Sequence, residues 1–280
     1  MASSTIRLGL IGDNIAQSQA PRLHRLAGLQ NDRAVTYDRL VPHEQGKAFD
    51  PLFSDIADAG YRGVNITYPY KERASTKVII EDDLVRAMGA VNTVVFAEGG
   101  PHGFNTDYSG FIRAYRRIWG VTEPGPVLMI GAGGVGKAIA FGLVALGLQD
   151  IRIADLDIPK AQGLASALRL ACPHLHADVG SDAGGLSQGV NGIINCTPIG
   201  MDGYPGTPLD RRFMAGASWA FDAVYTPLNT VFLEDARKQG LQTISGYELF
   251  IGQGLDAWRI FTGLPLDEDR LRADLLNLSK

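Results

Sequence analysis

Short apolar runs alternate with segments of helical spacing along the first third of the chain. Each run stops at glycine or at a polar residue, and the runs predict strands over 7–12, 35–41 and 63–67. Two helices are predicted between them, one entered through Pro21, which suits the first turn of a helix, and one over 48–59 that ends at Gly60. This alternation predicts a mainly parallel sheet with helical crossovers.

A second strand–helix series follows a predicted helix over 108–119. Its apolar runs predict strands over 126–130, 151–155, 192–197 and 219–224, with a helix over 134–146. The chain ends in two segments of helical spacing, over 247–261 and 267–278. Two such series in 280 residues predict an α/β protein of two domains, with a boundary near residues 105–112.

The composition excludes several classes of protein. Hydrophobic residues make up 45% and charged residues 20% of the chain, which is typical of a globular protein rather than a disordered one. The formal net charge of −4 argues against nucleic acid or an anionic membrane as the main partner, and no apolar run approaches the roughly 20 residues of a membrane-spanning helix. The first residues have no signal-peptide pattern, and two cysteines, Cys172 and Cys196, form no disulfide framework, so we expect a reducing, cytoplasmic location.

Glycine is in clear excess, with 34 residues where average usage gives roughly 20. Its densest cluster, between a predicted strand and a predicted helix, fits G-x-G-x-x-G and contains Gly131, Gly133, Gly134 and Gly136. In that context glycines permit a tight turn and let a pyrophosphate approach the backbone N–H groups at the helix N-terminus. The cluster therefore predicts a dinucleotide-binding site.

An acidic residue at the end of the next predicted strand bears on the choice of cofactor. Asp155 stands about 20 positions after the glycines, where a carboxylate accepts hydrogen bonds from the cofactor ribose. The alternative is a glycine turn followed by an aspartate that caps a helix. Leu156 and Asp157 offer no cation for the 2′-phosphate of NADP, and Lys160 is interpreted as a helix-surface lysine. The sequence therefore predicts NAD rather than NADP.

Three short polar segments lie at the ends of predicted elements in the first domain, over 65–71, 89–93 and 103–107. The first places Lys71 just past a strand end, the second contains Asn92 and the third contains Asp107. Each residue also has an ordinary structural interpretation. Lys71 is then a solvated lysine, Asn92 satisfies a turn, and Asp107 caps the helix predicted over 108–119.

Together, these segments resemble the shikimate/quinate dehydrogenase family over nearly the whole chain. The matching motifs, in chain order, are Ile11-Gly12 with Ser18-x-x-Pro21-x-x-His24, Asn65-Ile66-Thr67-x-Pro69-x-Lys71, Gly89-Ala90-Val91-Asn92-Thr93, Asn105-Thr106-Asp107-x-x-Gly110, Gly131-Ala132-Gly133-Gly134, Asn195-x-Thr197-Pro198-x-Gly200-Met201, Asp222-x-Val224-Tyr225-x-Pro227 and Gln253. So many matches in one order are highly specific, and chance does not explain them.

The resemblance implies a fold, a reaction and a set of site residues. It implies an N-terminal α/β substrate domain over 1–108, completed by returning C-terminal helices in 241–280, and a Rossmann-like, doubly wound NAD(P)-binding domain over 109–240. It implies reversible oxidation of the C3 hydroxyl of shikimate to 3-dehydroshikimate by hydride transfer to a nicotinamide, in the cleft between the domains. By position, Lys71 and Asp107 match the catalytic pair, and the matching substrate-binding positions are Ser18, Thr67, Asn92, Tyr225 and Gln253.

Departures from the family pattern leave the substrate open. Ala20 stands where a second hydroxyl residue is usual before the proline, and Gln17 replaces a common histidine. Members that use NADP carry Asn-Arg-Thr where this chain has Asp-Leu-Asp at 155–157, which places it nearer the NAD-using branch. Quinate or an amino-substituted ring acid is therefore an alternative substrate.

Two other functions fit part of the pattern. One is a non-enzymatic ring-acid sensor of the same fold, against which the intact Lys71 and Asp107 argue. The other is a folate-type dehydrogenase of related architecture, which fits the second domain but not the segment 105–107 or Gln253.

The remaining distinctive residues are interpreted as structural. Cys172, His174 and His176 have metal-binding side chains, but they lie in a predicted loop, and we expect no metal site there. Trp258 and Phe261, on the last predicted helices, are expected in the core.

Overall fold

The computed structural model describes residues 5–277, which fold into two compact units. The first unit comprises Met1–Thr106 with Gln253–Lys280, and the second comprises Asp107–Gly252. Two α/β domains are therefore present as predicted, but the predicted boundary at 240/241 falls too early. The reason is a short strand, Gln242–Ile244, which pairs within the sheet of the second unit and keeps the following residues there.

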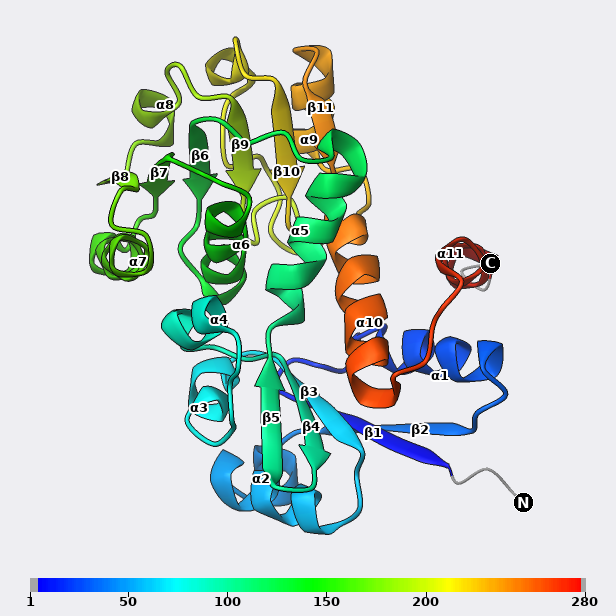
Figure 1. Ribbon diagram of the computed structural model, residues 1–280. Coiled ribbons are helices and arrows are strands. Elements are labelled where there is room, and N and C mark those ends of the chain that lie inside the picture. Colours follow the sequence, from blue (N-terminus) through cyan, green and yellow to red (C-terminus); the bar gives the residue numbers. More distant parts are fainter. Residues whose placement is uncertain (1–4, 278–280) are drawn as a thin grey trace. The chain divides into compact units, whose positions relative to one another are not determined.

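The first unit is built on a five-stranded sheet in the order β2-β1-β3-β4-β5 (Figure 1). Its strands are β1 (Ile6–Ile11), β2 (Val35–Leu40), β3 (Gly63–Ile66), β4 (Thr93–Ala97) and β5 (Gly100–Phe104). β1 pairs in parallel with β2 and β3, whereas β4 is antiparallel to both β3 and β5. The sequence pattern predicts the three parallel strands and misses the hairpin, because β5 lacks the apolar run that marks a strand.

One face of this sheet is covered by α1 (Ala20–Gln30) and by the first unit's part of α10 (Gly246–Thr262). Leu8 and Leu10 alternate along β1 and pack with Tyr37 and Phe261 in one buried cluster. Trp258 and Phe261 are fully buried, which confirms that they belong to the core. The other helices of this unit are η1 (His43–Gln45), α2 (Phe49–Asp58), α3 (Lys71–Ser75), α4 (Asp83–Met88) and α11 (Glu268–Asn277).

The outer edge of β5 is partly closed by Ile79, an extended residue outside the strands. Its backbone N–H donates to the Pro101 carbonyl at 2.9 Å, and its carbonyl accepts from the Gly103 N–H at 2.8 Å. Backbone groups of the sheet edge at 101–103 are therefore already paired within the chain.

The second unit is built on a six-stranded sheet in the order β11-β10-β9-β6-β7-β8, and every pair in it is parallel. Its strands are β6 (Val127–Ile130), β7 (Asp150–Ala154), β8 (His176–Gly180), β9 (Gly192–Asn195), β10 (Trp219–Asp222) and β11 (Gln242–Ile244). Counted from its own first strand, this unit has the order 6-5-4-1-2-3, which is that of a doubly wound dinucleotide-binding fold. The predicted Rossmann-like architecture is confirmed.

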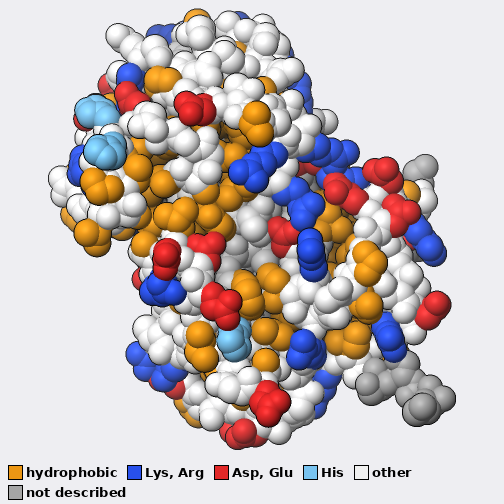
Figure 2. All heavy atoms as spheres, in the orientation of Figure 1, with side chains coloured by type: hydrophobic (Ala, Val, Ile, Leu, Met, Phe, Trp, Pro, Cys, Tyr) orange, Lys and Arg blue, Asp and Glu red, His pale blue; other side chains and the backbone are white. Residues whose placement is uncertain are grey.

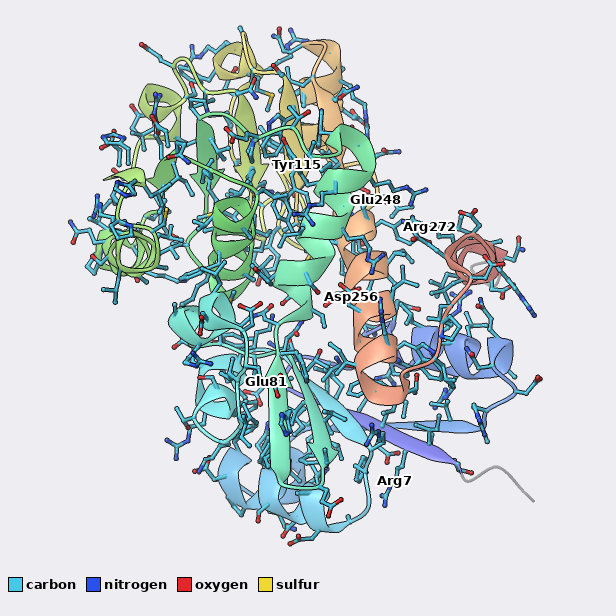
Figure 3. All side chains as sticks on the ribbon, viewed as in Figure 1. Arg7, Glu81, Tyr115, Glu248, Asp256 and Arg272 are labelled. Atoms are coloured by element: carbon cyan, nitrogen blue, oxygen red, sulfur yellow. The ribbon has the colours of Figure 1, made fainter. Side chains whose placement is uncertain are left out.

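Helices cover both faces of this second sheet, as neighbouring side chains on β10 show. Ala220 packs in a buried cluster with Phe232 and Leu233 of α9 (Val231–Lys238), whereas Phe221 meets Phe111 of α5 (Thr106–Trp119) edge-on, with ring centroids 5.2 Å apart. Glu248 of α10, labelled in Figure 3, lies 3.5 Å from an arginine of α5 and ties these two helices together within this unit. The helices of this unit are α5 (Thr106–Trp119), α6 (Gly134–Ala145), α7 (Ile158–Ala171), α8 (Ala183–Leu186), η2 (Arg211–Met214) and α9 (Val231–Lys238).

The segment around the second unit's cysteine and histidines differs from the prediction. His176 begins β8 rather than lying in a loop, because its backbone continues the parallel ladder beside Asp150. Within residues 5–277, no group of three or more His, Cys, Asp and Glu side chains is arranged to hold a metal ion.

In the same part of the chain, no helix is long and apolar enough to cross a membrane. Acidic and basic side chains are interspersed over the face seen in Figure 2.

Candidate active site

The three polar segments predicted from the sequence meet at one end of the strands of the first sheet. In its register, Asn65 at the end of β3 lies opposite Thr93 at the start of β4, and Thr93 lies opposite Phe104 at the end of β5. The segments that leave these three strand ends are therefore neighbours. The antiparallel hairpin of β4 and β5, which the sequence pattern misses, brings the second and third polar segments to the same strand ends as the first.

Lys71 is held at these strand ends through its backbone. A turn closes with the Tyr70 N–H donating to the Thr67 carbonyl at 2.9 Å, and Lys71 then begins α3. The Lys71 carbonyl accepts from the Val91 N–H at 3.0 Å, and the Tyr70 hydroxyl donates to Asp13 Oδ1 at 2.7 Å. Lys71 is half-buried, so it is not the fully solvated lysine of the ordinary interpretation.

Asp107 is a buried acid in the first turn of α5. Only 5% of its surface is exposed. The helix begins at Thr106, one residue earlier than the cap interpretation requires, so Asp107 lies inside the helix and that interpretation is wrong. The first turn of a helix carries partial positive charge from its free N–H groups, which favours a carboxylate there.

Asn92 is oriented by the start of α5. Its Oδ1 accepts from the Thr106 N–H at 2.7 Å and from the Thr106 hydroxyl at 3.1 Å. The Thr93 hydroxyl is a third donor to the same oxygen, at 3.1 Å. Asn92 therefore does more than satisfy a turn, because its side chain joins the second polar segment to the third.

Ser18 lies just before α1, and Gln253 lies in α10, two helices that cover the first sheet. The Ser18 hydroxyl oxygen accepts from the Ala20 N–H at 3.3 Å, which leaves its own proton for a further acceptor. Gln253 is half-buried in α10, where the following Gly254 faces Leu23 so closely that a Cβ would lie 2.4 Å from it. This close packing fixes the part of α10 that carries Gln253.

Tyr225 lies in the second unit, in the loop that follows β10. Its ring stacks on Phe250 of α10, with centroids 5.4 Å apart and an interplanar angle of 11°. Burial raises the pKa of the Tyr225 phenol, so the group stays a neutral donor at physiological pH.

The glycine cluster of the second unit has the shape that its sequence predicts. Gly131 has a φ of +99°, and a Cβ there would lie 2.8 Å from the backbone of Cys196. A Cβ on Gly136 would lie 2.2 Å from the Gly131 carbonyl oxygen, so only glycine lets α6 start against the turn. Gly133 is the N-cap of α6, and a Cβ on Gly134 would meet open space. The residues present therefore fit a pyrophosphate at this helix N-terminus.

Asp155 braces this glycine turn. Its Oδ2 accepts from the Ala132 N–H at 2.7 Å and its Oδ1 from the Asp157 N–H at 2.9 Å. The helix cap is Asp157, which accepts from the Lys160 N–H at 3.1 Å, so the capping role considered for Asp155 belongs to its neighbour. Lys160 is exposed on α7, and its Nζ lies 3.7 Å from the position of a Cβ on Gly133.

A buried carboxylate joins the loops that follow β9 and β10. Asp222 is fully buried and accepts from Asn195 Nδ2 at 2.9 Å, from the Val224 N–H at 3.0 Å and from the Thr230 hydroxyl at 2.6 Å. Burial raises its pKa to about 6, although these three donors pull in the opposite direction.

Sequence reasoning assigned no role to Asn195 and Asp222 beyond their place in family motifs. The signal that marks them is a polar residue ending an otherwise apolar strand that is buried on both faces. Next to Asn195, burial raises the pKa of the Cys196 thiol, and the Asp222 charge adds to this shift. Cys196 therefore stays a thiol and is no candidate nucleophile.

Comparison with known proteins gives consistent matches. Residues 10–94 match the family described as the shikimate dehydrogenase substrate binding domain. A quinate/shikimate dehydrogenase (NAD(+)) of Corynebacterium efficiens is 38% identical over 285 residues, covering 99% of this chain and 100% of that protein. A shikimate dehydrogenase (NADP(+)) of Pseudarthrobacter chlorophenolicus is 34% identical over 276 residues, covering 97% and 94%.

Two solved structures extend the likeness to three dimensions. The quinate dehydrogenase of Corynebacterium glutamicum in complex with NAD matches with a TM-score of 0.91 at 35% identity, covering 98% of this chain and 99% of that one. The shikimate 5-dehydrogenase of Thermus thermophilus in complex with NADP(H) and shikimate matches with a TM-score of 0.82 at 29% identity, covering 96% and 98%. The likeness spans both units and at least 94% of the length of each of these relatives, and this chain belongs to the shikimate/quinate dehydrogenase family.

Proposed function

We propose that this protein is an NAD-preferring dehydrogenase that reversibly oxidises the C3 hydroxyl of shikimate to 3-dehydroshikimate. The observation that carries the proposal is that the segments of Lys71, Asn92 and Asp107 leave neighbouring strand ends of the first sheet. Two full-length relatives support it, since one is named a quinate/shikimate dehydrogenase (NAD(+)) and the other is a quinate dehydrogenase in complex with NAD.

In the proposed mechanism, Lys71 and Asp107 act on the proton of the C3 hydroxyl. NAD, when bound, accepts the hydride that leaves C3. As the hydride leaves with its electron pair, the hydroxyl proton passes to the Lys71 amine and the C–O bond becomes a carbonyl. Asp107 orients the resulting ammonium and offsets its charge. In the alternative role, Lys71 stays protonated and stabilises the developing alkoxide.

The substrate is held by polar side chains that suit a polyol acid. Ser18 keeps a hydroxyl proton to donate to the carboxylate, while Thr67, Asn92, Tyr225 and Gln253 contribute hydrogen bonds to the ring substituents. A site built from such groups rejects a ring that lacks the matching hydroxyl, because its own polar groups are then left unpaired.

NAD is favoured by the turn after β7. Asp155 holds the glycine turn through Ala132 and retains lone pairs for ribose hydroxyls. A 2′-phosphate would meet two carboxylates there, and the side chain between them is Leu156, which is 92% exposed and offers no charge. Gly131, Gly133, Gly134 and Gly136 form the cradle for the pyrophosphate.

Quinate is a second candidate substrate, and Ala20 favours it. The family pattern usually has a hydroxyl residue at this position, whereas here a methyl group stands two residues from Ser18. A methyl group takes less space than the side chain of serine or threonine, which is compatible with the additional C1 substituent of quinate.

We place the enzyme in the cytoplasm. Both cysteines, Cys172 and Cys196, are free thiols. Free thiols are the usual state in a reducing compartment.

Initial rates with shikimate and quinate, each with NAD and NADP, test the proposed function. We expect turnover with at least one ring acid and a higher kcat/KM with NAD than with NADP. Binding of shikimate measured by calorimetry, without turnover under any of the four conditions, would instead support the ring-acid sensor.

A further inference from the structure

A chain of buried polar side chains runs across the first unit and ends at Asn92. It starts at Tyr37 on β2, passes through the half-buried Asn65 on β3 and the buried Thr93 on β4, and reaches Asn92 and Thr106. The Tyr37 hydroxyl lies 2.8 Å from Asn65 Oδ1, and Asn65 Nδ2 lies 3.0 Å from Thr93 Oγ1. Thr93 and Thr106 are at most 1% exposed, so water does not compete for these groups.

The chemistry of each group fixes the direction of this chain. Burial raises the pKa of the Tyr37 phenol, so it keeps its proton and donates to Asn65 Oδ1. The amide of Asn65 is thereby oriented, and its Nδ2 donates to Thr93. The single proton of Thr93 must then point onward, to Asn92 Oδ1 at 3.1 Å or to Thr106 Oγ1 at 3.2 Å.

Three donor groups surround one atom of Asn92 at the end of the chain. Its Oδ1 faces the Thr106 N–H at 2.7 Å and the hydroxyls of Thr106 and Thr93 at 3.1 Å each. A backbone N–H accepts nothing, so the amide cannot turn over without placing two donors against each other. The Nδ2 group of Asn92 makes no hydrogen bond to any residue between 5 and 277.

We propose that Thr93 is a positioning residue for substrate, because it locks the Asn92 amide with its NH2 group toward the ring acid. This inference rests on the proposed function. The site then offers only donors at this place and reads an oxygen that carries lone pairs, namely a ring hydroxyl or the product ketone. An ammonium substituent at the same ring position brings its own N–H donors and is rejected. An amino-substituted ring acid is accordingly a poor substrate of this protein.

The first experiment removes the Thr93 hydroxyl at constant volume. Thr93→Val should raise the Kd and the KM for the ring acid about tenfold, while the KM for NAD and kcat change little. Thr93→Ser keeps the hydroxyl and should restore the KM. Thr36→Val, on the exposed side of β2, is the matched control. A general loss of folding would change all constants together, and urea unfolding of each variant detects it. If folded Thr93→Val binds the ring acid as wild type does, or if Thr93→Ser is equally impaired, the inference is wrong.

The second experiment reverses the hydrogen-bonding character at Asn92. Asn92→Asp still accepts from Thr106 but presents an acceptor to the ring, so its affinity for shikimate should fall about tenfold or more while its preference for an ammonium-substituted analogue rises. An unchanged ratio of the two affinities contradicts the inference. Calorimetric binding separates the two levels of the argument: wild type that binds neither shikimate nor quinate overturns the proposed function, whereas normal binding with no effect of Thr93→Val overturns only the positioning role.

Discussion

Each of the two sheets carries a buried polar network at the ends of its strands, but only one network contains an ionised acid. In the first unit, Asn65, Thr93 and Asn92 are all uncharged. In the second unit, the Asp222 carboxylate is the common acceptor for Asn195 and Thr230. The first network contains only groups that are neutral at physiological pH, whereas the second depends on a group whose pKa is about 6.

The comparison shows where charge is avoided and where it is used. His24 stacks on Tyr37 of the first network. Burial lowers the pKa of His24 to about 4, so this side chain is also neutral at physiological pH. The network that orients the Asn92 amide therefore has no group that is charged at physiological pH. The network that holds the loops after β9 and β10 uses a carboxylate, which binds three donors more strongly than a neutral acceptor does.

The largest expected effect is on the chemical step assigned to the first unit. Lys71→Ala and Asp107→Ala should each lower kcat by at least about 10²-fold, the scale of acid–base catalysis, while NAD still binds to the second unit. Lys77→Ala, which removes a surface lysine paired with Asp50 at 2.8 Å, is the control and should leave kcat near wild type. Near-native turnover by folded Lys71→Ala would remove the lysine from the mechanism.

The second prediction tests the ionised network through the pH dependence of stability. The folded-state pKa of Asp222 is raised from 3.8 to about 6, so the native state holds this proton more tightly than the unfolded chain does. The associated stability is fully present below about pH 4 and is lost as the pH rises through 6, an effect on the order of 3 kcal/mol. Asp222→Asn has no such titration and should gain stability relative to wild type between pH 4 and 7.

Urea unfolding of both proteins across this pH range measures the difference, in which the opposite contribution of His24 cancels. Asp202→Asn, at an exposed acid, is the control and should run parallel to wild type. Parallel curves for Asp222→Asn as well would mean that Asp222 titrates normally.

The third prediction concerns the cofactor turn of the second unit. Wild type should prefer NAD, and Asp155→Asn with Leu156→Arg should shift the ratio of kcat/KM values toward NADP by about ten- to a hundredfold, because one negative charge is lost and a forked cation is gained. The new amide oxygen can still accept from Ala132. Leu170→Arg, at a leucine of α7 that is 85% exposed, controls for the added charge. A wild-type preference for NADP would overturn this interpretation of the turn.

The smallest effect is expected at Ala20. If the added hydroxyl reaches the carboxylate, Ala20→Ser should lower the KM for shikimate by about one to two decades with little change in kcat. If Ala20 instead makes room for quinate, the same change should raise the KM for quinate. An unchanged KM for both acids would show that position 20 does not reach the carboxylate.

Most of the parallel framework was predictable because each strand is a compact apolar run with a clear stop. The glycine cluster was predictable for a related reason, since a pattern of glycines between a strand and a helix has few structural solutions. β5 was not predictable, because a segment of Gly, Pro and His becomes a strand only through pairing with β4. The same limit applies to Thr93 and Asn65, whose importance depends on cross-strand neighbours that the linear sequence does not reveal.

The pairing of Ile79 with β5 has a consequence for encounters with other chains. An unpaired sheet edge offers a row of backbone donors and acceptors on which a foreign peptide can add as a further strand. Here the groups of Pro101 and Gly103 are already bonded to Ile79. An extended peptide, or an unfolded copy of the same protein, therefore finds no template along that part of β5, and the first sheet is protected there against growth into an aggregate.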